Sequence, residues 1–140
     1  MLYLDTSVLV AMTTNERRTS DALAWLDGQE TDRLSISDWV ITEFSSALSI
    51  KLLERQIKIS ERAEALAAFT QLYAEALTVL PVFRVHFREA ARIADQYASG
   101  IRAGDALHLA VCLDHGATLC TLDRRFAEAG AMLGSKTELL

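Results

Sequence analysis

Apolar and polar residues follow two different periods along the chain, which predicts short strands separated by helices. Short runs rich in Val, Leu, Ile and Thr have the composition of strands. We place the strands at residues 2–4, 33–37, 77–82 and 117–122, with a weaker fifth at 137–140. Between these runs, apolar residues recur every three or four positions, as on one face of a helix. The predicted helices run from Thr19 or Ser20 to Asp27 and over residues 39–55, 60–77, 85–98 and 105–115, with a short one after Phe126.

This alternation of strands and helices predicts an α/β fold with a mostly parallel sheet covered on both faces. The sequence has no repeat, low-complexity tract or linker, so we expect one domain over residues 1–140. Ser60, like Thr19 or Ser20, is a typical N-cap, and Gly116 is typical of a helix end. In such a sheet the carboxyl ends of the strands and the amino ends of the helices meet at one edge, where ligands bind.

The stretch LYLDTSVLV, from Leu2 to Val10, resembles a buried strand interrupted by an acid. We end the strand at Leu4, which places Asp5 at its carboxyl end. A carboxylate in an apolar environment is unfavourable unless other groups compensate its charge. Asp5 is therefore the first candidate for a functional residue.

Three more acids are predicted at the same edge. Asp123 follows the strand TLCTL, Asp105 opens the helix DALHLAVCLDH, and Glu43 lies on the apolar face of the long helix. Each has a simpler structural interpretation. Asp105 is a possible N-cap, Asp123 a cap or turn residue, and Glu43 an early-turn acid favoured by the helix dipole. Their joint placement favours a site.

Several carboxylates at one place require a cation or shared protons. Two carboxylates about 4 Å apart repel by roughly 4 kcal/mol at an effective dielectric constant near 20. A set of oxygen ligands without a histidine pair or cysteine selects Mg²⁺ or Mn²⁺ over zinc. We therefore expect a divalent ion to compensate Asp5. Carboxylate-held metal ions of this kind serve phosphodiester hydrolysis.

Composition and charge narrow the function classes. The chain has 14 basic and 19 acidic residues, a net charge of −5, which argues against nonspecific nucleic-acid binding but permits a local basic rim. No apolar run is long enough to cross a membrane, and the N-terminus is a poor signal peptide. We expect a cytoplasmic protein whose two cysteines, Cys112 and Cys120, are reduced core residues.

Four motifs resemble the PIN-domain ribonucleases, and more narrowly the VapC toxins of type II toxin–antitoxin systems. They are YLDTSVLV, ITEF, GDALHLA and TLDRRF, in this order over nearly the whole chain. The resemblance implies a Rossmann-like, three-layer α/β PIN domain and Mg²⁺- or Mn²⁺-dependent cleavage of single-stranded RNA. It also implies a prokaryotic cytoplasmic setting, a homodimer and inhibition by a VapB-type antitoxin within a larger complex.

The family's acidic positions fall on the same four acids. Under this resemblance Asp5, Glu43 and Asp105 are metal ligands, and Asp123 joins them or orients a metal-bound water. The proposed supporting hydroxyls are Thr6, Ser7 and Thr121, with simple turn capping as the alternative. The proposed phosphate contacts are Arg102, Arg124 and Arg125, with solvated surface charge as the alternative. We interpret His108 as a packed or partly exposed histidine rather than a ligand or base.

Other functions remain open at this point. A haloacid-dehalogenase phosphatase requires a second Asp where Ser7 stands, and receiver domains require an acidic pair and a later Lys that we do not find. A PIN-fold nuclease of RNA processing and a non-catalytic metal- or RNA-binding module are the alternatives.

For the antitoxin, the region 40–77 offers a candidate groove for an apolar helix. Its apolar residues are Ile41, Leu48, Leu52, Leu53, Ile57 and Ile59.

Overall fold

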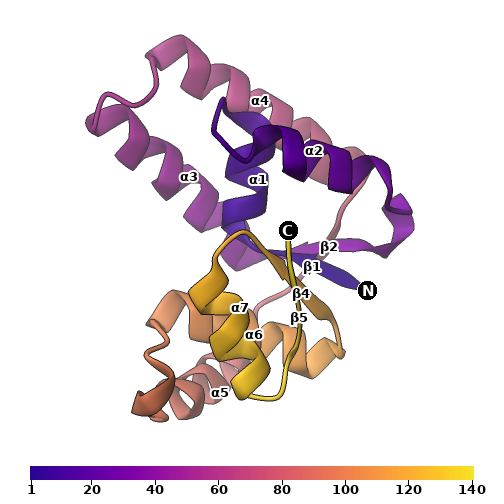
Figure 1. Ribbon diagram of the computed structural model, residues 1–140, viewed down its shortest axis with the longest axis vertical. Helices are drawn as coiled ribbons and strands as arrows, with labels where there is room; N and C mark the ends of the chain where they lie inside the picture. Colours follow the sequence, from indigo (N-terminus) through magenta and orange to yellow (C-terminus); the bar gives the residue numbers. More distant parts are fainter.

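The structure, a computed structural model, describes residues 1–140 and contains a five-stranded parallel sheet (Figure 1). The strands lie in the order β3-β2-β1-β4-β5, and every neighbouring pair is parallel. They are β1 (Leu2–Leu4), β2 (Leu34–Ser37), β3 (Thr78–Leu80), β4 (Thr118–Thr121) and β5 (Lys136–Leu139). All five predicted strands are therefore confirmed, including the weak last one.

Helices cover both faces of this sheet and complete the predicted three-layer fold. They are α1 (Thr6–Thr13), α2 (Thr19–Asp27), α3 (Asp38–Leu53), α4 (Ile59–Glu75), α5 (Arg84–Ala94), α6 (Ala103–His115) and α7 (Arg124–Met132). Figure 1 shows α1–α4 on one face and α5–α7 on the other. The reason is the strand order: the chain moves outward from β1 to β3, then returns to β4 on the other side of β1. With crossovers of one hand, this reversal exchanges the face that the helices cover.

Helix α1 was not predicted, because its sequence is rich in β-branched residues and continues the strand-like pattern of β1. Asp5 ends the strand pattern and caps the new helix, since its Oδ1 accepts a hydrogen bond from the Val8 amide at 3.2 Å. Val8, Leu9 and Val10 are buried in the core, and the helix packs against α3 and α4. The cap and this packing outweigh the local β-propensity.

Several predicted helix ends are wrong by a few residues. The N-cap of α2 is Arg18, not Thr19 or Ser20, and α4 begins at Ile59, so Ser60 lies inside it. The Glu61 carboxylate caps α4 by accepting the Lys58 amide at 2.6 Å. Helix α5 ends four residues before the predicted end at residue 98, and a short 3₁₀ helix, Tyr97–Ser99, follows.

At α6 the predicted end is confirmed and the predicted start is not. Gly116 ends the helix in the left-handed conformation at φ 60°, as expected of a glycine. The helix begins at Ala103, which makes Asp105 its third residue and not its N-cap. This shift matters for the site, because Asp105 is free of a capping role.

The core contains the two predicted buried cysteines. Cys112 and Cys120 are both unpaired and buried, and burial raises the pKa of Cys120 to about 12 and that of Cys112 well above its usual range. No helix of the structure is both long and apolar enough to span a lipid bilayer.

Candidate active site

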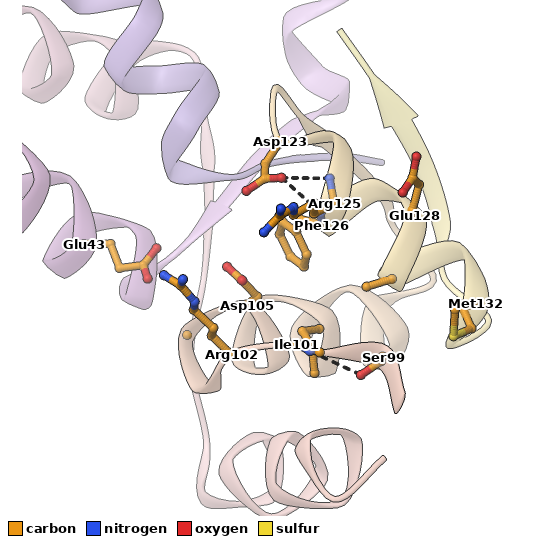
Figure 2. A pocket seen from close by; sticks show the side chains of 13 residues that line it. Glu43, Ser99, Ile101, Arg102, Asp105, Asp123, Arg125, Phe126, Glu128 and Met132 are labelled. Atoms are coloured by element: carbon orange, nitrogen blue, oxygen red, sulfur yellow. Dashed lines mark hydrogen bonds between the residues drawn. The ribbon is translucent and has the colours of Figure 1, made fainter. Parts of the chain in front are cut away.

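A cavity of about 690 Å³ at the carboxyl edge of the sheet is lined by residues from α3, from residues 99–105 at the start of α6, from the turn after β4 and from α7. It lies where the strand order reverses between β1 and β4, and α3 and α6 approach it from opposite faces of the sheet. Such a switch point is where open α/β sheets bind ligands. Glu43, Asp105 and Asp123 line this cavity (Figure 2).

Asp5 does not line this cavity and has only 5% of its surface exposed. Its Oδ1 accepts hydrogen bonds from Ser7 Oγ at 2.6 Å and the Val8 amide, and its Oδ2 accepts from Thr121 Oγ1 at 2.7 Å. Burial raises the pKa of Asp5, and these hydrogen bonds and the charge of His108 oppose the rise. The pKa of Asp5 stays raised overall, so these protein donors offset only part of the effect of burial, and a compensating ion at Asp5 stays a prediction.

The same two hydroxyls connect the loops that follow β1 and β4. Ser7 Oγ accepts the Leu122 amide at 3.1 Å, and Thr121 Oγ1 accepts the Asp123 amide at 3.0 Å. Asp123 is the N-cap of α7, because its Oδ1 accepts the Arg125 and Phe126 amides at 2.8 and 3.2 Å (Figure 2). The capping interpretation of Asp123 is thus correct, and it still leaves Oδ2 on the cavity side free of protein donors.

Glu43 is held by side chains from α1 and α6. Its Oε2 accepts hydrogen bonds from Thr6 Oγ1 at 2.7 Å and from His108 Nε2 at 2.6 Å. Desolvation alone would raise the pKa of Glu43, but the hydrogen bond and charge of His108, with donors from Thr6 and Trp39, lower it overall. The Trp39 indole N–H is buried and makes no full hydrogen bond. Glu43 therefore stays ionised beside the cavity.

Asp105 differs from the other three acids because no protein group pairs with it. Its carboxylate forms no hydrogen bond or ion pair and points into the cavity between Glu43 and Asp123 (Figure 2). Burial raises the pKa of Asp105, the charge of His108 opposes this, and the charges of Glu43, Asp123 and Asp5 raise it further. An unpaired carboxylate among like charges, in a site whose ligands are all oxygens, fits a hard divalent cation.

The carboxylates form an open arrangement. No three of the four present oxygen atoms within 4.8 Å of one another; the one such cluster in the chain is His86, Asp114 and His115, at the far end of α6. That cluster is poorly suited to a metal. His86 Nδ1 accepts the Phe83 amide at 3.0 Å, so the proton of the neutral ring is on Nε2, which faces Asp114 at 3.1 Å. A metal-binding histidine needs the opposite tautomer, with its other nitrogen donating.

The three predicted arginines divide between two cavities. Arg102 and Arg125 line the acidic cavity, and Figure 2 shows Arg102 reaching from the start of α6 toward Glu43 and Asp105. Arg124 lines a neighbouring cavity of about 530 Å³, together with Thr6 and Ser7. All three arginines are exposed, so they remain available to a polyanion at the rim of the site.

Sequence reasoning missed the residues that support Glu43. Tyr3, Ser37 and His108 are buried and connected to it by hydrogen bonds, and Gly104 lies directly against it. A pattern in the sequence did exist for His108, because it lies three residues after Asp105 and so shares its helix face. Tyr3 and Ser37 have no comparable pattern, since both look like ordinary strand residues.

The fold and the acidic cavity define a doubly wound α/β protein with a carboxylate-lined site at its switch point. The PIN domain family model matches residues 2–132, and the chain belongs to the PIN domain family. The family resemblance drawn from the four motifs is thereby confirmed. No curated protein sequence matches the chain significantly.

Solved structures share this fold over nearly their whole length. VapC20 of Mycobacterium tuberculosis, a sarcin-ricin loop cleaving toxin, has a TM-score of 0.74 at 20% identity, covering 93% of this chain and 95% of its own. FitAcB of Neisseria gonorrhoeae has a TM-score of 0.70 at 16% identity, covering 98% and 96%. VapBC2 of Rickettsia felis, bound to a DNA fragment from its promoter, has a TM-score of 0.68 at 15% identity, covering 99% and 98%. At these identities the likeness shows the fold.

Proposed function

We propose that this protein is a metal-dependent endoribonuclease that cleaves single-stranded or loop RNA as the toxin of a type II toxin–antitoxin pair. The observation that carries the proposal is the Asp105 carboxylate, unpaired and with a raised pKa, in a cavity lined by Glu43 and Asp123. An acid with a purely structural role would have a protein partner, and Asp105 has none. Membership of the PIN domain family and the likeness to toxin–antitoxin structures support the same function.

Mg²⁺ or Mn²⁺ is the proposed cofactor, with Asp5, Glu43, Asp105 and Asp123 as its proposed ligands; the last three line the cavity and Asp5 does not. Such an ion acidifies a bound water and stabilises negative charge on a phosphate. The chain's own hydroxyls hold the carboxylates: Ser7 and Thr121 orient Asp5, and Thr6 orients Glu43. The second oxygens of Glu43 and Asp123 stay available because the full hydrogen bonds to each carboxylate go to one oxygen only.

RNA is the proposed substrate, and the exposed arginines at the rim supply its phosphate contacts. Arg102 and Arg125 border the acidic cavity, and Arg124 borders the adjoining one, so a strand crossing Asp123 would meet cations on both sides. This local basic rim offsets the net charge of −5, which would otherwise repel a polyanion.

A VapB-type antitoxin is the proposed partner, bound to apolar side chains of the α3–α4 hairpin, in a larger complex built on a toxin homodimer. Of the candidate groove residues, Leu48 is fully buried and is excluded from this surface. Ile41, Leu52 and Ile57 are partly buried, while Leu53 and Ile59 are exposed at 83% and 77%. The two exposed residues are therefore the strongest candidates for contact with an antitoxin helix.

The proposal is tested by incubating the purified chain with a single-stranded RNA and a hairpin RNA, with Mg²⁺ or with EDTA. We expect cleavage that requires the metal, is lost in Asp105→Asn, and persists in Glu128→Gln, which removes a different carboxylate from the same cavity. Metal binding without cleavage of either RNA would identify a binding module instead. Cleavage that survives EDTA, or survives Asp105→Asn at the wild-type rate, would contradict the proposed chemistry.

A further inference from the structure

A chain of buried hydrogen bonds runs from the sheet to Glu43. In β2, Ser37 Oγ lies 2.6 Å from Tyr3 Oη of β1, and Tyr3 Oη lies 2.8 Å from His108 Nδ1 of α6. His108 Nε2 then lies 2.6 Å from Glu43 Oε2. Ser37, Tyr3 and His108 are each at most 2% exposed, and we call these three residues the buried relay.

The direction of the last bond is fixed by chemistry. An ionised carboxylate only accepts, so His108 Nε2 must carry the proton and donate it to Glu43. In the neutral ring, Nδ1 must then accept from the Tyr3 hydroxyl, and Tyr3 Oη, having donated its only proton, accepts from Ser37 Oγ. The Tyr3 hydroxyl thus complements the tautomer of His108 that donates to Glu43. In the charged ring the Nε2–H donor is the same.

This relay leaves the two oxygens of Glu43 in different environments. Oε2 receives two hydrogen bonds, from His108 and Thr6, and has little remaining capacity. Oε1 lies beside the Cα of Gly104, at the wall of the acidic cavity, and receives no hydrogen bond from a protein group within full bonding geometry. The carboxylate is therefore fixed with one oxygen occupied and one oxygen free.

We propose that Tyr3 and His108 are positioning residues that hold Glu43 so that its Oε1 is presented to a divalent cation. The inference rests on the proposed function, because it assumes that Glu43 is a metal ligand. It adds that the buried relay, which touches neither the cavity nor the substrate, sets the strength of metal binding. Outer partners of metal ligands typically contribute roughly 10- to 100-fold in affinity.

The relay also connects two of the proposed ligands. His108 follows Asp105 by one helical turn, so α6 carries one ligand and the group that holds the other. Tyr3 packs edge-on against the His108 ring at a centroid distance of 5.7 Å, and Phe126 of α7 packs against it at 6.1 Å. The His108 ring consequently has little freedom to move. Because His108 and Asp105 lie on the same helix, the position of Glu43 in α3 is coupled to that of Asp105 in α6.

The chain offers a matched control in His86. It is equally buried, at 2%, and also hydrogen-bonded on both ring nitrogens, but its partners are the Phe83 amide and Asp114, far from the acidic cavity. Replacing His86 disturbs the packing of α5 on α6 without reaching Glu43. It therefore separates general loss of stability from loss of positioning.

The first experiment measures the affinity for Mn²⁺ alone by calorimetry or electron paramagnetic resonance. His108→Asn, whose shorter side chain cannot reach Glu43, should bind Mn²⁺ roughly 10- to 100-fold more weakly. His108→Gln, which places an N–H near the Nε2 position, should stay close to wild type. Tyr3→Phe should show an intermediate loss, and His86→Asn should bind as wild type does. Wild-type affinity in His108→Asn or Tyr3→Phe would overturn the proposal.

The second experiment uses ¹⁵N-histidine NMR of the metal-free protein. We expect His108 to carry its proton on Nε2, with a slowly exchanging signal that shifts in Glu43→Gln, while the Nδ1 signal shifts in Tyr3→Phe, which removes the donor to Nδ1. A proton found on Nδ1 in wild type would overturn the proposal. These readouts are independent of RNA cleavage. If wild type binds Mn²⁺ but cuts no RNA, only the proposed function is contradicted. If wild type binds no Mn²⁺, the proposed role of Glu43 as a metal ligand is contradicted. The NMR result alone then tests whether Tyr3 and His108 position Glu43.

Discussion

The backbone of Gly104 in α6 lies directly against the Glu43 carboxylate of α3. A Cβ atom added to Gly104 would lie 2.7 Å from Glu43 Oε1, closer than two such atoms can approach. The Glu43 carboxylate cannot move away without strain on its other oxygen, which is hydrogen-bonded to Thr6 and His108. The glycine is thus required at this position by a side chain from another helix.

Gly104→Ala should weaken metal binding without destabilising the fold. The added methyl displaces Oε1, and we expect Mn²⁺ affinity to fall by about tenfold. Alanine is the better helix former by up to about 1 kcal/mol, so the free energy of unfolding should stay constant or rise. Mn²⁺ titration and urea unfolding measure the two effects.

Gly130→Ala is the matched control for this prediction. Its Cβ would lie 2.8 Å from Thr137 Cγ2 and 3.2 Å from Leu109 Cδ2, inside the core. Overpacking of this kind typically costs about 1–3 kcal/mol. We expect lower stability and unchanged Mn²⁺ affinity, the reverse of Gly104→Ala. Equal effects of both variants on Mn²⁺ affinity would show that the Gly104 contact is not specific to the site.

Asp105→Asn should stabilise the metal-free protein and abolish its stabilisation by metal. Burial raises the pKa of Asp105, and repulsion from Glu43, Asp123 and Asp5 raises it further. The substitution removes the charge of Asp105 and so relieves this repulsion. Wild type should gain about 2.7 kcal/mol at a Mn²⁺ concentration near 100 times the Kd. Thermal unfolding with and without Mn²⁺ measures both changes. A variant that Mn²⁺ still stabilises fully would show that Asp105 is not a ligand.

Arg102→Ala and Arg125→Ala should weaken RNA binding by a similar factor for all sequences. If each arginine contacts one phosphate, its loss reduces the logarithmic salt slope by roughly 0.7 for a single strand. Arg88→Ala, on the exposed surface of α5, is the control and should keep the wild-type slope. Binding measured between low and moderate salt decides the matter; wild-type slopes in all variants would assign these arginines to another role.

Leu53→Lys and Ile59→Lys should each weaken antitoxin binding by about tenfold, equivalent to about 1.4 kcal/mol, while RNA cleavage is unchanged. Both side chains are exposed, so a lysine there opposes an apolar contact without disturbing the core. Val85→Lys on α5, an exposed position on the other face, is the control. Calorimetry with the proposed VapB-type antitoxin measures the affinities, and wild-type affinity in both hairpin variants would contradict the proposed binding surface.

Both thiols should be unreactive in the folded protein. Burial raises the pKa of Cys112 and Cys120, so the thiolate is scarce at pH 8, and Ellman's reagent should react with them only after urea is added. The raised pKa values determine how the stability of the protein changes with pH. The folded state retains these protons more strongly, so the associated stability is present below the unfolded pKa near 8.5 and is lost as the pH rises toward about 12. Urea unfolding of Cys120→Ala between pH 8 and 11 should show a weaker loss of stability than wild type.

The local pattern of the sequence determined the fold class and the place of the site. Strand composition and helical periodicity require only neighbouring residues, and they located all five strands and six of the seven helices. Because carboxyl ends of parallel strands share an edge, the positions of Asp5 and Asp123 after β1 and β4 were enough to bring them together. The same reasoning placed Glu43 and Asp105 on that edge, and the structure shows that their helices lie on opposite faces of the sheet.

The tertiary structure alone decided how those acids are held, because their partners come from distant parts of the chain. Helix α1 forms against its own β-propensity, since its apolar residues are buried beneath α3 and α4. Asp5 finds its donor Thr121 only because β1 and β4 are neighbours in the sheet. His108 and Gly104 contact Glu43, and Tyr3 contacts His108, only because β1, α3 and α6 pack together, and sequence periodicity does not reveal such contacts. Sequence spacing therefore fixed which groups reach the edge, while packing fixed which oxygen atoms remain free.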